Sequence, residues 1–368
     1  MRGRPAALIA ILLISIASMA PAVHGEQRTR YIYTSTFIFE NRGSSPYNLT
    51  EADATITLFM NDTWQTVKIL NSTAPITRSY YDEDGNLLAI LNFSSKIPPN
   101  SKLEFSVSYD MQVSSRSKPA LDIAKAGVLA DVPDELANKW TNKTVTFTTG
   151  DRAIKELAEG LTKNQTTVLG KVLNLLGWFE DHVSANSAET PRYPNETLSG
   201  GKGDCDDQAM LLITMLRTLG IPAYLQVGVV FSELIQDETT LWWGHLKSQQ
   251  SGIGWHGWAM VYVPPWGWLP IDMTLIEAKD PLSRIMESPE YGDFIVACMN
   301  ISEQDYIGDT RRARDELVES ELYVTSVDKG VLIKESSNPI TTIYVMLGIS
   351  GASVIIVMVA FVVIKRRK

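Results

Sequence analysis

The chain contains little cysteine, few histidines and no surplus of positive charge. Among 368 residues there are 2 cysteines and 4 histidines, and 33 Lys and Arg stand against 42 Asp and Glu. Two cysteines are too few for a disulfide framework, so folding must rest on a packed core. Such an acidic chain is a poor partner for nucleic acid. With no zinc-type ligand spacing and no glycine-rich phosphate loop, we expect no metal and no cofactor.

The N-terminus has the pattern of a secretory signal. Arg2 and Arg4 precede an apolar run at residues 6–17, which ends in small residues. The run is shorter than the roughly 20 residues that span a bilayer, which favours cleavage over an uncleaved anchor. We therefore predict a signal peptide at residues 1–25.

The C-terminus has the pattern of a membrane anchor. Residues 340–364 carry no charge and would span about 37 Å as a helix. The basic tail at residues 365–368 would then be cytoplasmic. We predict a single-pass protein of the cell membrane with its N-terminal domains outside. After subtraction of two basic residues in the signal and four in the tail, the outer part carries 27 − 42 = −15 charges.

Eight Asn-x-Ser/Thr sites support an exterior location, because this motif is the acceptor for N-glycosylation. All lie in the proposed outer part: Asn48, Asn61, Asn71, Asn92, Asn142, Asn164, Asn195 and Asn300.

The first outer segment, residues 26–118, reads as short strands rich in β-branched and aromatic residues, separated by turn residues. This pattern predicts an all-β sandwich. The acidic stretch Asp82–Asn86 has its glycine too early for a calcium loop, so we interpret it as a hairpin turn.

The next segment, residues 119–300, predicts helices followed by an antiparallel sheet, an α+β arrangement. Apolar residues recur at helical spacing over residues 154–161, 168–179 and 205–219, and strands are indicated at residues 223–231, 258–263 and 268–271. Residues 301–339 read as a helical segment followed by a stalk.

Cys205 is predicted to occupy the first position of a helix, after Asp204 as N-cap. Unpaired backbone N–H groups at that place favour a thiolate. The neighbouring carboxylates oppose it, so a reactive cysteine would need a histidine partner. His256 precedes a strand that turns at Pro264 and Pro265, and a hairpin there would place His256 opposite Asp272 or one diagonal step away. A nucleophile, a base and an orienting carboxylate then follow in chain order.

Four separated motifs in this order resemble the signature of the transglutaminase-like superfamily, whose core has a papain-like fold. They are 203–209 (GDCDDQA), 216–223 (LRTLGIPA), 256–258 (HGW) and 267–274 (GWLPIDMT). The resemblance covers roughly residues 121–275, and the β-rich segment before it is similar to the immunoglobulin-like domains that often precede this core in microbial surface members.

The resemblance implies that Cys205 is the nucleophile, His256 the general base and acid, and Asp272 the orienting carboxylate. The family often has an acidic residue where this chain has Met260, and a proline where it has Met273, which leaves substrate specificity open. Three tryptophans near the motifs are candidates for a substrate cleft: Trp242, Trp243 and Trp258.

Other readings of these residues stand beside the catalytic one. Cys205 could be a buried thiol or form a disulfide with Cys298, which otherwise reads as a core residue. His256 could be a structural histidine and Asp272 a turn residue. His182 and His245 are expected to be solvated.

The sequence thus predicts an extracellular thiol acyl-transfer enzyme that acts on amide bonds of a protein or peptide, most simply a cysteine peptidase or amidase. A cross-linking protein-glutamine gamma-glutamyltransferase would use the same residues and differ only in the acceptor of the acyl group. A non-catalytic surface binding module on the same fold is the alternative from another class.

Overall fold

The computed structural model describes residues 28–333. The predicted signal peptide, membrane helix and basic tail lie outside this range. Within it, no helix is both long and apolar enough to cross a bilayer.

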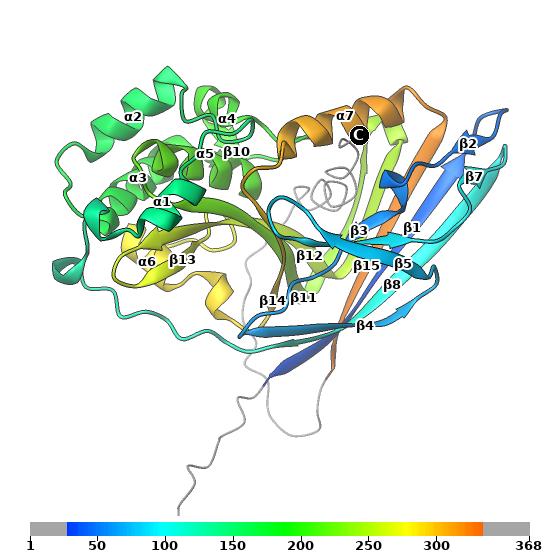
Figure 1. Ribbon diagram of the computed structural model, residues 1–368, viewed down its shortest axis with the longest axis horizontal. Coiled ribbons are helices and arrows are strands. Elements are labelled where there is room, and N and C mark those ends of the chain that lie inside the picture. The colour runs from blue at the N-terminus through cyan, green and yellow to red at the C-terminus, as the bar shows by residue number, and fades with distance from the viewer. Residues whose placement is uncertain (1–27, 334–368) are drawn as a thin grey trace, which may run out of the picture.

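One eight-stranded sheet organises the described residues (Figure 1). Its strands follow the order β14-β11-β12-β15-β1-β8-β4, and β13 pairs with β12 beside this path. β1 and β8 alternate between buried and partly exposed positions, so one of their faces points to the core. β11 over Leu225–Phe231 and β12 over Ile253–Val261 are buried on both faces. The strands are β1 (Thr29–Asn41), β4 (Gln65–Ser72), β8 (Ser101–Val113), β11 (Ala223–Leu241), β12 (Leu246–Val263), β13 (Gly267–Ile271), β14 (Ile295–Ile301) and β15 (Leu322–Ile333).

The sheet is mixed rather than antiparallel as predicted. β12 runs parallel to β15 over Leu246–Ser251, whereas the other pairings within this sheet are antiparallel. The parallel pair arises because β15 returns to the sheet after a helix and enters between β12 and β1.

The N-terminal strands extend this same sheet and do not form a separate immunoglobulin-like sandwich. β1 and β8 pair along their whole length, and β1 also pairs with β15 near the end of the described chain. The sheet therefore crosses the predicted boundary at residues 118 and 119. The shorter strands form small sheets beside it: β3 (Thr55–Thr57), β5 (Ile76–Tyr81) and β6 (Leu87–Leu91); β2 (Tyr47–Asn48) with β7 (Lys96–Ile97); and β9 (Ser184–Ala185) with β10 (Lys202–Gly203).

The predicted hairpin turn at Asp82–Asn86 is present between β5 and β6. It also ties this hairpin to the rest of the molecule, because Asp84 accepts hydrogen bonds from the backbone N–H groups of Ser302, Glu303 and Gln304. The oxygens of this acidic side chain are thus held by backbone donors.

The helices α1 to α5 gather at one end of the molecule, and α7 crosses beside the strands (Figure 1). α5 begins after the predicted cap Asp204, and α2 and α3 begin after Asp151 and Thr167; each of these side chains accepts a backbone N–H of the first turn. α5 is buried on all sides from Cys205 to Arg217. The helices are α1 (Asp134–Trp140), α2 (Arg152–Thr162), α3 (Val168–His182), α4 (Pro194–Gly200), α5 (Cys205–Thr218), α6 (Pro281–Met286) and α7 (Tyr306–Val318).

The prediction of a stalk is wrong for the residues up to 333, which form strand β15. β15 follows α7 directly and is held between β1 and β12. Its inward positions change from Leu322 and Val324 to Ser326 and Asp328, all of them buried. This change removes the alternation of apolar and polar residues by which a half-buried strand is recognised.

Candidate active site

Cys205 lies at the first position of α5, as predicted, and is 5% exposed. Asp204 and Asp207 form a capping box, in which each side chain accepts the other's backbone N–H at 3.4 Å. Backbone N–H groups of a first helical turn have no acceptor within the helix, so the start of α5 offers donors beside the sulfur.

His256 and Asp272 are joined directly in the core. The imidazole Nε2 bonds Asp272 Oδ2, and the side chains are 4% and 0% exposed. Asp272 Oδ1 accepts the N–H groups of Thr274 at 2.9 Å and Leu275 at 2.8 Å, which fixes the carboxylate. Because Nε2 faces a carboxylate, it carries the proton, and Nδ1 is the basic nitrogen of the neutral ring.

The sequence predicted that His256 lies either directly opposite Asp272 or one diagonal step away, and the structure has the diagonal arrangement. β12 and β13 pair with Val263 opposite Gly267 and Ala259 opposite Ile271, so the register centres on Pro265. Continued by one residue pair, this register sets Asp272 against Trp258, two residues beyond His256. His256 and Asp272 are therefore diagonal neighbours on one face.

Gly257 joins the cysteine to the histidine. Its backbone N–H bonds the Cys205 sulfur and lowers the pKa of the thiol. A Cβ at Gly257 would lie 3.3 Å from Asp206 Cβ, so α5 packs against this strand position with almost no spare room. The residue after His256 thus touches the residues at the start of α5.

The electrostatics of the three residues differ. Burial, then the charges of Asp206 and Asp204, raises the pKa of Cys205 well above its ordinary value. Burial alone would lower the pKa of His256, but Asp272 raises it above the ordinary value. Burial alone would raise the pKa of Asp272, but the charge and hydrogen bond of His256 hold it below. The directions of these shifts favour a neutral thiol at Cys205 and an ionised carboxylate at Asp272.

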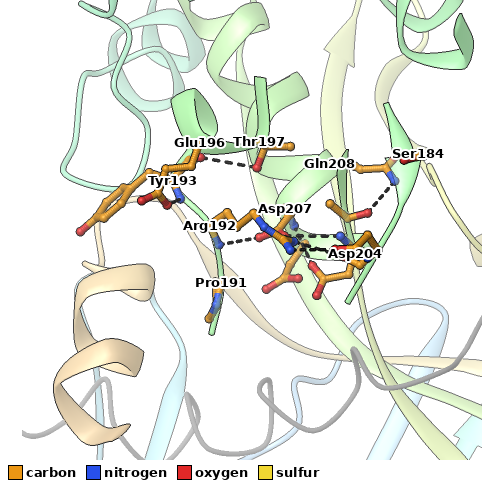
Figure 2. A network of polar contacts seen from close by, with 12 residues as sticks. Ser184, Pro191, Arg192, Tyr193, Glu196, Thr197, Asp204, Asp207 and Gln208 are labelled. Carbon is orange, nitrogen blue, oxygen red and sulfur yellow. Dashed lines mark hydrogen bonds and ion pairs between the residues drawn. The ribbon is translucent and has the colours of Figure 1, made fainter. Parts of the chain in front are cut away.

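Two of the three carboxylates around Cys205 are held by partners that sequence reasoning missed, and Figure 2 shows the one at Asp207. Arg192 donates to Asp207 through Nη1 at 2.5 Å and through its backbone N–H at 2.6 Å. Tyr306, from α7, donates its hydroxyl to Asp206 at 2.7 Å. Even so, burial, then the charge of Asp206, raises the pKa of Asp207 to about 6.

A fourth acid, Glu290, lies at the histidine and was not predicted. It is 2% exposed, and one potential ligand atom from each of Glu290, His256 and Asp272 lies within 4.8 Å of the others. Burial, then repulsion from Asp272, raises the pKa of Glu290 to about 8. No sequence motif surrounds Glu290. It lies in the chain between β13 and β14.

Among residues 28–333, two groups of side chains are close enough to hold a metal ion: His256, Asp272 and Glu290, and Asp204, Asp206 and Asp207. In the first group Nε2 of His256 is already bonded to Asp272. In the second group Arg192 and Tyr306 occupy oxygens of two carboxylates.

The three tryptophans do not line one cleft. Trp258 is fully buried, with its ring 6.0 Å from that of His256. Trp242 is also buried and donates Nε1–H to the Glu189 carbonyl, whereas Trp243 is 79% exposed. Both lie at the far tip of the β11–β12 hairpin, about 30 Å of strand from His256.

The remaining histidines and cysteines are placed as follows. His182 is exposed, as expected. His245 is buried, contrary to the prediction, because its ring stacks on Tyr323 and bonds the Leu322 carbonyl at 2.9 Å. Cys205 and Cys298 are free thiols and both are buried.

The site thus consists of a helix with a buried cysteine at its start, packed against a strand that carries a carboxylate-bound histidine. In comparison with known proteins, residues 155–273 match the profile of the Transglutaminase-like superfamily, and this segment contains Cys205, His256 and Asp272. The chain therefore contains a transglutaminase-like domain.

Solved structures extend the similarity of fold. A structure named "Putative Cysteine Protease from Cytophaga hutchinsonii" matches at TM-score 0.51 and 15% identity, over 85% of this chain and 93% of that one. A second, named "putative protease from Parabacteroides distasonis", matches at 12% identity over 68% and 70% of the two chains. Its TM-score of 0.22 is too low to show a common fold. A search of curated proteins finds no match.

Proposed function

We propose that this protein is a cysteine peptidase or amidase that uses Cys205, His256 and Asp272 on a protein or peptide substrate. The observation that carries the proposal is the buried His256–Asp272 contact, with the start of α5 packed against the next residue of the same strand. A structural histidine would not need an ionised carboxylate that is itself fixed by two backbone N–H groups.

The chemistry follows from the protonation states. Cys205 rests as a thiol, so its proton passes to His256 Nδ1 as the sulfur attacks the amide carbon. Asp272 stabilises the resulting imidazolium, and N–H groups at the start of α5 stabilise the oxyanion. The C–N bond then breaks, the imidazolium proton goes to the leaving amine, and an acyl-enzyme remains.

Release of the acyl group decides the class of enzyme. Attack by water, with its proton taken by His256, gives a carboxylic acid and a peptidase. Attack by a primary amine gives a new amide and a cross-linking transglutaminase. The cysteine-protease name of the structure with the same fold favours water.

We further propose that the protein acts outside the cell, anchored by residues 340–364. Seven of the eight glycosylation sites are exposed. The eighth, Asn300, is half-buried and accepts a hydrogen bond from Gln226 at 2.8 Å. This distribution suits a glycosylated surface, with Asn300 left unmodified.

The test incubates the purified protein with casein, with and without a biotinylated primary amine, and follows both peptide fragments and biotin incorporation. We expect fragments and little incorporation. Cys205→Ala should abolish both products, and Asp272→Asn should lower the rate by roughly 10³-fold because it leaves the imidazole without its anion.

A second readout does not depend on substrate choice. Iodoacetamide followed by peptide mapping should label Cys205 and not Cys298, and His256→Ala should remove the labelling. Incorporation in excess of cleavage would identify a transglutaminase. A Cys205 as inert as Cys298 in the native protein would rule out both enzymes and leave the binding module.

A further inference from the structure

Glu290 is a buried acid for which the proposed reaction has no use. It lies in the 3-10 turn η5 (Pro289–Tyr291), directly before β14, and one of its atoms is within 4.8 Å of both His256 and Asp272. One carboxylate oxygen, Oε2, accepts the hydroxyl of Ser288. The other, Oε1, is buried and has no hydrogen-bond partner.

An unpartnered carboxylate oxygen is costly in a core, and more so beside another carboxylate. The titratable groups that face Glu290 are His256 on β12, Asp272 after β13 and Tyr291 next to it in the chain. Arg284 reaches this region from α6, but it bonds the backbone carbonyl of Asp272. Among residues 28–333, no Lys or Arg pairs with Glu290.

Neutralisation by a proton is therefore the remaining way to accommodate this carboxyl group. A proton on Oε1 turns the unpartnered acceptor into a donor, and it removes the repulsion between Glu290 and Asp272. Geometry and charge agree on this state.

We propose that Glu290 is a positioning residue that works in its protonated form, so that Asp272 is the single anion beside the catalytic imidazole. The proposal rests on the function proposed above and concerns the regulation of the same site by pH.

The consequence is an upper pH limit for the site. Below pH of about 8 the carboxyl group of Glu290 keeps its proton, because burial and Asp272 raise its pKa to that value. Above it, a second negative charge disfavours a thiolate at Cys205, as the charge of Asp272 does, and this lowers the reactivity of the thiol.

The experiment measures the alkylation rate of Cys205 by iodoacetamide from pH 5 to 10 in the full chain, together with infrared spectra of the same samples. The variants are Glu290→Gln, which is always neutral, and Glu287→Gln, a matched control that removes one exposed acid three residues away. Infrared spectra of the wild type as a function of pH need no variant and so do not depend on its folding.

We expect the wild-type rate to stop rising near pH 8, whereas that of Glu290→Gln continues to rise and exceeds it by roughly three- to tenfold at pH 10. Glu287→Gln should follow the wild type. A carbonyl stretch of a protonated carboxylic acid that wild type shows at pH 7 and loses by pH 10 should be missing from the spectra of Glu290→Gln.

Identical pH profiles for wild type and Glu290→Gln, or the absence of the protonated-acid band at pH 7, would overturn the proposal. If Cys205 is inert in every variant, the proposed enzyme fails, and the infrared band alone then decides the state of Glu290. The two failures are thus distinguishable.

Discussion

At the scale of single residues, the start of α5 sets opposing influences on Cys205. The helix N-terminus and the N–H of Gly257 favour a thiolate, whereas burial and the charges of Asp206 and Asp204 disfavour it. Burial and the two carboxylates prevail, since the pKa of the Cys205 thiol is raised. In the proposed reaction the site supplies a cation only when His256 takes the proton, so proton transfer and attack by Cys205 belong to the same step.

Arg192 is the cation that makes the acidic helix start tolerable. The pKa of Asp207, at about 6, is above its ordinary value, so its favourable contribution to folding is complete below pH of about 4 and is lost as pH rises through 6. Removal of Arg192 raises that pKa further, so Arg192→Gln should lower the free energy of unfolding by about 3 kcal/mol at pH 7 and by clearly less at pH 5. Urea unfolding at both pH values measures this.

Arg314→Gln is the control for this experiment. Arg314 pairs with Asp315 at the surface, and removal of such an exposed pair should change stability by less than about 1 kcal/mol at either pH. Equal losses for Arg192→Gln at pH 5 and pH 7 would show that packing of the side chain, and not its charge, is what matters.

At the scale of elements, the sequence predicted correctly those helices and contacts that depend on residues close together in the chain. The apolar spacing of α2, α3 and α5 predicted all three helices, and the short β12–β13 connection predicted the contact of His256 with Asp272. Each depends on residues close in the chain. The sequence resemblance added the order of the motifs.

The missed features depend on residues distant in the chain. β15 presents Ser326 and Asp328 to the core, which no periodicity marks as buried, and its partners lie near residues 30 and 250. Glu290 meets His256 only because β14 pairs with β11. The early strands were found, but which sheet they join depends on these distant pairings.

The contact of β12 with α5 should be sensitive to one added carbon. In Gly257→Ala the new Cβ would be 3.3 Å from Asp206 Cβ and 3.5 Å from Leu225 Cδ1. α5 must shift by a few tenths of an ångström, which should cost about 1–2 kcal/mol and slow alkylation of Cys205 by roughly tenfold.

Gly160→Ala is the matched substitution, since nothing lies within 4 Å of its Cβ position in α2. It should raise stability by up to about 1 kcal/mol and leave the alkylation rate unchanged. Normal reactivity in a stable Gly257→Ala variant would show that the start of α5 is not held by this strand position.

At the scale of the whole molecule, the sheet makes the N-terminal strands part of the catalytic fold. Tyr31 of β1 stacks on Phe231 of β11 at 4.0 Å, and the ring of Phe59 lies 5.9 Å from that of Trp255, the residue before His256. The structure with the same fold also matches over 85% of this chain, well beyond the 119 residues of the family profile. Burial of the far half of β12 therefore depends on residues outside the segment that the motifs define.

The segment 119–300, which sequence motifs alone define as the catalytic domain, should accordingly fail to fold. It keeps Cys205, His256 and Asp272 but loses β1 and β15, so the edge of β12 and the apolar faces of Phe231 and Trp255 become exposed, an arrangement that favours aggregation. We expect residues 28–333 to unfold in one cooperative transition and residues 119–300 to lack near-ultraviolet circular dichroism and to bind a hydrophobic dye. A cooperative 119–300 segment with a reactive Cys205 would instead establish an independent catalytic domain, with the N-terminal strands as an accessory to it.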